Sequence, residues 1–189
     1  SLFQSVTRTS GFSTVDFDAS DGYGLGIPFM ILMLFLMFVG SSSSSTGGGI
    51  KTSTFAIIWA SFTKTIRGKK HTAIFNRTIS QDLIGKAFAV LLIFIGGNLI
   101  CIFALSITEA EILASQGRTI FDLVFEEVSA FGTVGLSTGI TADLSEAGKY
   151  IIVISMFVGR VGTLTIAYLF GKKLLSRNYK YPSGHTMVG

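Results

Sequence analysis

A ten-residue pattern that occurs twice constrains the fold of this chain more than any other feature. The first copy, Ser5 to Thr14, is SVTRTSGFST, and the second copy, Ser129 to Thr138, is SAFGTVGLST. Both copies fit SxxxTxGxST, which pairs Thr9 with Thr133 and Gly11 with Gly135. Because each copy is also followed by a long apolar stretch, the repetition predicts two equivalent structural units in one chain.

The composition favours a chain that lies within a lipid bilayer. Hydrophobic residues make up 49% of it, charged residues only 14%, and there are 17 phenylalanines. About 20 apolar residues cross the hydrocarbon core as a helix, and this rule predicts three spans. The spans are Ala87 to Thr108, Tyr150 to Gly171, and an interrupted one made of Ile27 to Val39 and Thr52 to Thr63. The expected fold class is therefore an all-α membrane protein.

The distribution of charge predicts which segments lie on which side of the membrane. The loop 64–81 and the tail 176–189 carry basic residues and no acid, whereas seven acids and two basic residues occupy Thr108 to Lys149. By the positive-inside rule the loop and the tail are cytoplasmic and the acidic segment is outside. The net charge of +4 then follows from topology and does not indicate nucleic acid binding. A solvated cytoplasmic face is the expected role of these basic residues, with anionic lipid or a cytoplasmic partner as the alternatives.

The segment before the second copy predicts a re-entrant helix. Ile120 to Phe131 is apolar but too short to span a bilayer. Non-helical backbone at membrane depth must be buried in protein or line water, so the extended return is expected to line a pore. The predicted second unit has an outer helix at 82–108, a pore helix at 120–131, a filter at 133–138 and an inner helix at 149–175. The predicted first unit has a filter at 5–14 and a broken inner helix at 25–63, and it is expected to be truncated because only four residues precede its filter.

Each copy has the chemistry needed to bind a dehydrated potassium ion. Consecutive backbone carbonyls supply oxygen ligands without a buried formal charge, and turning them to one axis requires positive φ at some positions, which glycine accepts. The sequence around Gly135 is also similar to the carbonyl-ring sequence of potassium-channel filters. The candidate ion-binding residues are Thr9, Ser10, Gly11, Phe12, Thr133, Val134, Gly135 and Leu136. An ordinary polar turn is the alternative interpretation of either copy alone.

The serine-glycine loop, Gly40 to Ile50, is expected to interrupt a helix in mid-membrane. It is no phosphate-binding loop, because Ile50 stands between Gly49 and Lys51 where GxxxxGK[ST] allows no residue. Polar backbone at this depth can only face an aqueous cavity, so a loop beneath a filter would obstruct the path. The candidate gating residues are Gly47, Gly48, Gly49, Lys51 and Arg160, where Lys51 could instead snorkel or cap carbonyls.

Arg160 is the one charge within the expected span Tyr150 to Gly171. A guanidinium near the middle of a bilayer costs at least ~2.5 kcal/mol, so it is expected to face protein or water. In a cation path it would act as an electrostatic barrier, and a buried structural pair is the alternative interpretation.

Other chemistries are not indicated. Cys101 is the single cysteine and is expected to pack as a small apolar residue, with no disulfide or thiolate metal site. His71 and His185 are isolated and have no second ligand at metal spacing. We expect no enzyme site, no organic cofactor, and no metal site beyond potassium at the filter.

Four ordered motifs carry a resemblance to a known family: RTSGFST, GSSSSSTGGGIKTSTF, FEEVSAFGTVGLSTGIT and FVGRVGTLTI. Together they resemble the Ktr/Trk/HKT superfamily of potassium transporters, most closely the bacterial Ktr membrane subunit. This resemblance implies four helix–pore loop–helix repeats around one pseudo-fourfold pore, of which the chain is a fragment covering the end of repeat three and all of repeat four. It also implies that Gly11 and Gly135 are filter glycines, that the serine-glycine loop is the gate, and that Arg160 faces it. The serine-rich composition of that loop, and Thr163 where a proline is common, depart from the family pattern.

The resemblance further implies the function and the partners. We expect potassium uptake across the cell membrane, with sodium as an activating or coupling ion. The full-length chain is expected to form a homodimer in membrane lipid and to bind a cytoplasmic nucleotide-binding regulatory ring near the basic loop and the tail. Two alternatives remain at this point, namely a subunit of a tetrameric potassium channel and a non-transporting membrane scaffold.

Overall fold

The computed structural model describes residues 2–7, 9–13, 27–43, 45, 47–68, 73–74, 77–115 and 118–161. Several expectations fall outside these residues: Thr14, His71, the inner helix beyond Val161, and the tail with His185. The helices are α1 (Leu2–Thr7), α2 (Ile27–Phe38), α3 (Thr52–Ile66), α4 (Gln81–Thr108), α5 (Ala110–Ser115), α6 (Ile120–Phe131), the 3₁₀ turn η1 (Ile140–Ala142) and α7 (Glu146–Val161). Strands β1 (Ala73–Ile74) and β2 (Arg77–Thr78) form one short antiparallel pair in the expected cytoplasmic loop. The expected helical fold is confirmed.

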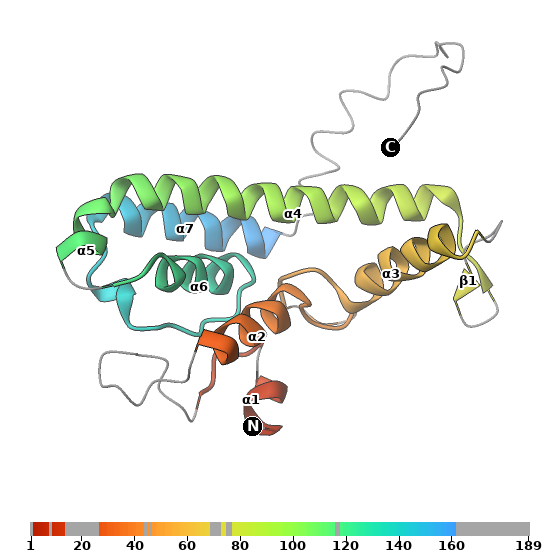
Figure 1. Ribbon diagram of the computed structural model, residues 1–189, viewed down its shortest axis with the longest axis horizontal. Helices are drawn as coiled ribbons and strands as arrows, with labels where there is room; N and C mark the ends of the chain where they lie inside the picture. The colour runs from red at the N-terminus through yellow and green to blue at the C-terminus, as the bar shows by residue number, and fades with distance from the viewer. Residues whose placement is uncertain are drawn as a thin grey trace, which may run out of the picture.

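Helix α4 is the scaffold against which the other helices pack. It runs the length of the molecule, with α6 and α7 along one half and α3 along the other (Figure 1). Helix α2 packs on α6 from the side opposite α4. One apolar cluster between α4, α6 and α7 is fully inside the molecule, and its buried members are Leu105, Leu123, Ala130, Ile140, Leu144 and Ile152.

The C-terminal end of α6 lies between two glycines on neighbouring helices. A Cβ atom at Gly97 of α4 would lie 2.9 Å from Phe131 Cζ, and one at Gly159 of α7 would overlap the Phe131 carbonyl oxygen. Interiors are close-packed, so any side chain at these glycines would push the helices apart. The two glycines thus set how closely α4 and α7 approach the end of α6.

Buried acids begin the two helices that flank the second copy. The Asp122 carboxylate accepts hydrogen bonds from the Thr119 backbone N–H at 2.8 Å and its hydroxyl at 2.9 Å, forming a capping box. The Glu109 carboxylate accepts from the Ser145 backbone N–H at 3.1 Å and its hydroxyl at 2.5 Å. Ser145 Oγ in turn accepts from the Gly148 N–H at 3.1 Å, so Ser145 is the N-cap and α7 begins at Glu146, three residues before the expected Lys149.

One helix in the described part of the chain, Gln81–Thr108, is long and apolar enough to cross a membrane. The expected interrupted span consists of the short apolar helix α2 and a separate helix α3, which continues to Ile66 rather than ending at Thr63. The third expected span coincides with α7 as far as Val161. Many large apolar side chains on these helices are exposed, among them Leu92, Leu99, Ile100, Phe103, Val153 and Phe157.

Candidate functional site

The second copy is a helix end followed by an extended return. Helix α6 ends at Phe131, and the Val134 N–H donates to the Ser129 carbonyl at 2.8 Å, which turns the chain back. Gly135 has φ 88° and Thr133 has φ 52°, an uncommon value for a residue with a branched side chain. The side chains of Val134 and Leu136 are buried in a cluster with Met33 and Met37 of α2. Because side chains alternate along an extended segment, Val134 and Leu136 both lie on one side of it, and this side packs against α2.

The first copy has the same arrangement with a shorter helix before it. Helix α1 ends at Thr7, and the Ser10 N–H donates to the Thr7 carbonyl at 2.9 Å. Gly11 has φ 75°, Thr9 is partly buried, and Phe12 is exposed. Residues 5–7 are helical, so the extended part begins later than the expected 5–14 boundary. The second copy does the same, because its initial serine also lies in a helix.

The structure brings the two copies side by side. A Cβ atom at Gly11 would lie 2.8 Å from the Val134 carbonyl oxygen and 3.3 Å from that of Gly135. A Cβ atom at Gly135 would lie 3.7 Å from Gly11 Cα. Two glycines far apart in the sequence, both with positive φ, therefore approach each other through their backbones.

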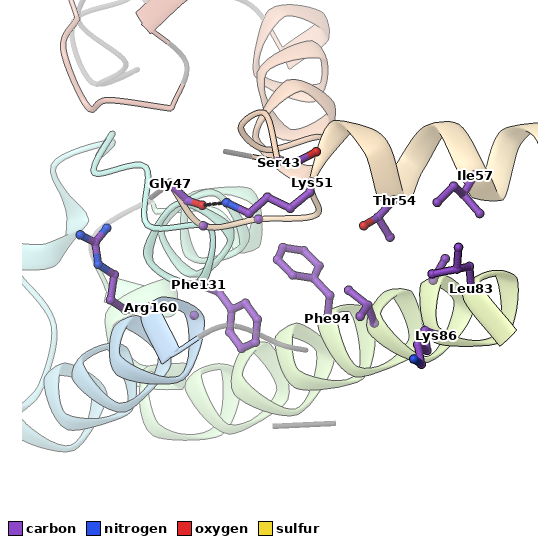
Figure 2. A pocket seen from close by; sticks show the side chains of 15 residues that line it. Ser43, Gly47, Lys51, Thr54, Ile57, Leu83, Lys86, Phe94, Phe131 and Arg160 are labelled. Atoms are coloured by element: carbon purple, nitrogen blue, oxygen red, sulfur yellow. Dashed lines mark hydrogen bonds between the residues drawn. The ribbon is translucent and has the colours of Figure 1, made fainter. Parts of the chain in front are cut away.

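The two ends of the serine-glycine loop are hydrogen-bonded to each other, and the Lys51 side chain binds oxygens within the loop. Val39 and Ile50 form a parallel bridge, and the Gly40 N–H donates to the Ile50 carbonyl at 2.9 Å. Lys51 Nζ donates to three oxygens, namely Ser45 O at 2.7 Å, Gly47 O at 2.5 Å and Ser41 Oγ at 3.2 Å. Figure 2 shows Lys51 reaching back to Gly47 in this way. These contacts use all three ammonium protons, so Lys51 caps the carbonyls of the loop that precedes it.

The C-terminal part of the serine-glycine loop, at Gly48, lies against the start of the extended return in the second copy. The Gly48 N–H donates to Thr133 Oγ1 at 2.8 Å. A Cβ atom at Gly48 would lie 2.6 Å from that oxygen and 2.7 Å from the Gly132 carbonyl oxygen. Only glycine permits so close an approach of two backbones.

Arg160 lies at the junction of two hollows. One, of about 450 Å³, lies between the loop, α4 and the end of α6, and its lining includes Lys51, Phe94, Phe131 and Arg160 (Figure 2). The other, of about 630 Å³, is lined by Thr133, Gly135 and Arg160 among others. The arrangement groups the expected gating residues at the α6 end of the second copy.

Sequence reasoning missed a carboxylate that braces the far end of the second copy. Glu126 is 6% exposed, and its carboxylate accepts from Ser137 Oγ at 3.0 Å and from the Thr141 hydroxyl. Arg118 Nη1 donates to the Thr138 carbonyl at 3.5 Å, and its Nη2 pairs with Asp143 at 3.2 Å. No local sequence pattern predicts that Glu126 binds Ser137 and Thr141. The two adjacent acids, Glu126 and Glu127, in a short apolar helix did indicate that a polar partner is needed.

A short helix, an extended return with glycine at positive φ, and a following helix occur here in the order that the sequence predicted for a pore-loop unit. The TrkH family model, described as "Cation transport protein", matches residues 1–181. The chain therefore belongs to the TrkH family of cation transport proteins, and the expected resemblance is confirmed. The family consists of transporters rather than enzymes, as expected, and membership implies a location in a membrane.

Curated relatives are similar over the whole chain. Ktr system potassium uptake protein B of Bacillus subtilis is 43% identical over 100% of the chain, which corresponds to 40% of the relative. Ktr system potassium uptake protein D of the same organism is 42% identical over 100% of the chain and 40% of the relative. Potassium/sodium uptake protein NtpJ of Enterococcus hirae is 38% identical over 100% of the chain and 41% of the relative. The chain spans about two fifths of the length of these relatives.

Proposed function

We propose that the protein containing this chain takes up potassium across the cell membrane through a filter to which the chain supplies two of four segments. The observation that carries this proposal is the adjacency of Gly11 and Gly135, both at positive φ and both in the repeated pattern. Backbone carbonyls in such turns can replace the hydration shell of a potassium ion. The proposed ligands come from Thr9 to Phe12 and Thr133 to Leu136.

The serine-glycine loop is the proposed gate. Gly48 of the loop donates a hydrogen bond to Thr133 at the end of α6, and Lys51 stabilises the loop by binding its oxygens. Arg160 lines the same cavity as Lys51, so two positive charges oppose a cation there while the loop is in place. Gly47, Gly48 and Gly49 allow the loop to rearrange at little conformational cost.

The remaining parts of the proposal follow from family membership. The names of the Bacillus subtilis relatives specify potassium uptake, and that of the Enterococcus hirae relative specifies potassium and sodium. Sodium is thus the proposed activating or coupling ion. The proposal also includes a pseudo-fourfold pore and a homodimer of the full-length chain in membrane lipid. The loop 64–81 and the tail 176–189 are proposed to be cytoplasmic, beside a nucleotide-binding regulatory ring.

The test is rubidium uptake into liposomes that contain the full-length protein. We expect cation-dependent uptake, and we expect Gly135→Ser to weaken the preference for potassium over sodium because its side chain penalises the required backbone. Gly96→Ala is the matched control, since nothing lies within 4 Å of a Cβ atom there. Absence of uptake, or unchanged selectivity in Gly135→Ser, would contradict the proposal.

Subunit stoichiometry separates this proposal from a tetrameric channel. Two non-identical copies of the pattern in one chain favour a single polypeptide that supplies all four segments. Four chains per pore would establish the channel alternative, and a folded protein that moves no cation would establish the scaffold.

A further inference from the structure

Glu127 is a buried carboxyl that neither the filter nor the gate explains. It lies on α6 with 0% of its surface exposed, and its Oε1 accepts a hydrogen bond from Ser155 Oγ of α7 at 2.6 Å. Its other oxygen, Oε2, has no hydrogen-bond partner among the described residues. Glu127 therefore joins two helices with half of its carboxyl unsatisfied.

Among the described residues, the groups that contact this carboxyl carry no positive charge. Helix α4 presents the Cys101 thiol to it, a weak donor at most. Helix α7 presents Ser155, and α2 packs on α6 through Met33 and Met37. On α6 itself, the neighbouring Glu126 is engaged with Ser137 and Thr141.

A carboxylate in such surroundings is costly. The effective desolvation penalty of a buried ion is several kcal/mol, and a single hydroxyl donor offsets only part of it. A neutral carboxylic acid avoids this penalty, and its O–H adds a donor where donors are lacking. Asn98, one turn from Cys101 on α4, also keeps a buried oxygen, Oδ1, without a partner in the described part of the chain.

The position of Glu127 connects it to the gate. Ser155 precedes Arg160 by five residues, about 7.5 Å along α7, and Gly159 contacts the last carbonyl of α6. The Glu127–Ser155 bond and this contact together hold Arg160 at a defined place relative to the second copy. A charge introduced between α6 and α7 would need water or a cation, and admitting either would displace α7.

We propose that Glu127 is a positioning residue that carries a proton in the resting transporter and, through Ser155, holds α7 and Arg160 in place beneath the second copy. Ionisation of Glu127 draws water or a cation between α6 and α7, which displaces α7 and lowers transport. The inference rests on the proposed function, because it assigns a role to Arg160 in the same pathway.

The experiment compares the full-length protein with Glu127→Gln, a neutral substitute of nearly the same shape. We expect a roughly tenfold loss of rubidium uptake in wild type as the pH rises by one unit beyond the ionisation of Glu127, and a flat profile in Glu127→Gln. Glu146→Gln, at an exposed position in the first turn of α7, is the matched control and keeps the wild-type profile. Identical normalised profiles in wild type and Glu127→Gln would overturn the inference.

Difference infrared spectroscopy tests the proton independently of transport. We expect the C=O stretch of a protonated carboxylic acid that disappears at alkaline pH and is missing from Glu127→Gln. An unchanged spectrum in that variant would overturn the inference even where uptake is normal. Wild-type protein that shows this band but takes up no cation would overturn the proposed function and leave the protonated Glu127 supported.

Discussion

The two copies share a backbone conformation but differ in how they are supported. The second copy is braced at one end by Gly48 and at the other by Glu126 and Arg118. In the described part of the first copy, the hydrogen bonds of Ser10 are local and end at Thr7. The helices also differ, because α2 and α3 are separated by a loop whereas α7 is continuous to Val161. A shared backbone conformation with different tertiary contacts agrees with our proposal that both copies bind the ion and that the gate acts at the second copy.

The largest expected effect comes from alanine at the two glycines of the proposed filter. Gly11→Ala places a Cβ atom 2.8 Å from the Val134 carbonyl oxygen, whereas at Gly135 the nearest atom would be 3.7 Å away. Both substitutions carry the cost of positive φ, about 1–2 kcal/mol, but only the first adds a steric overlap. Potassium-over-sodium selectivity, measured by ion competition for rubidium uptake, should fall by about tenfold or more in Gly11→Ala and by less in Gly135→Ala. Equal losses would mean that the two copies are not packed as differently as their contacts indicate.

A large effect on stability is expected at the crossing of α7 and α6. Gly159→Ala would overlap the Phe131 carbonyl oxygen and should destabilise the protein by about 1–3 kcal/mol. Gly85→Ala on α4 meets nothing within 4 Å and should be neutral or slightly stabilising. Thermal unfolding of both variants in detergent micelles checks the difference. Equal unfolding temperatures for Gly159→Ala and Gly85→Ala would show that α7 can shift away from α6 without loss of stability.

The asymmetry in gating predicts gains of flux from the loop. Deleting Ser43 to Gly48 should raise rubidium uptake, because it removes most of the loop, including Gly48, whose N–H binds Thr133. Lys51→Met should raise uptake by a smaller, several-fold factor, since the loop remains but loses three hydrogen bonds from the ammonium group. Loss of uptake in the deletion, with normal membrane insertion, would refute a gating role for the loop.

A moderate effect is expected from Glu126, whose carboxylate binds the Ser137 and Thr141 hydroxyls at the far end of the second copy. Glu126→Leu removes the acceptor of Ser137 and Thr141 and should cost about 1.5–3 kcal/mol in thermal unfolding. Glu126→Gln retains one acceptor and should cost less. An unchanged free energy of unfolding in Glu126→Leu would show that backbone contacts alone hold Ser137 in place.

The smallest effect is expected from Arg118. Its contact with Asp143 is partly exposed, with side chains 18% and 35% accessible, so Arg118→Ala should cost less than about 1 kcal/mol. The loss should shrink further in high salt, because screening weakens exposed pairs. Unfolding at two salt concentrations measures it, and a larger salt-independent loss would assign the contribution to the Thr138 carbonyl instead.

Prediction from sequence succeeded for features encoded within a few consecutive residues. The short apolar segment before the second copy, its glycine, and the polar break after α2 each have a local signature. Prediction was less successful at element boundaries. Helix α7 begins earlier than expected because Glu109, from another part of the chain, holds the N-cap residue Ser145 in place. Glu126 and Glu127 illustrate the same limit, since adjacent identical residues acquired different partners from η1 and α7.

The sequence by itself determined the helical fold, the duplicated pattern, the break between α2 and α3 and the single arginine in a long apolar segment, because periodicity, glycine and charge act through the local backbone and its solvent. Only the tertiary structure decided that Gly11 meets Gly135, that Gly48 binds Thr133, and that Glu127 is buried against Ser155. These contacts join residues that are distant in the chain. They depend on the distances between packed helices, and those distances are set by the volumes of many side chains together.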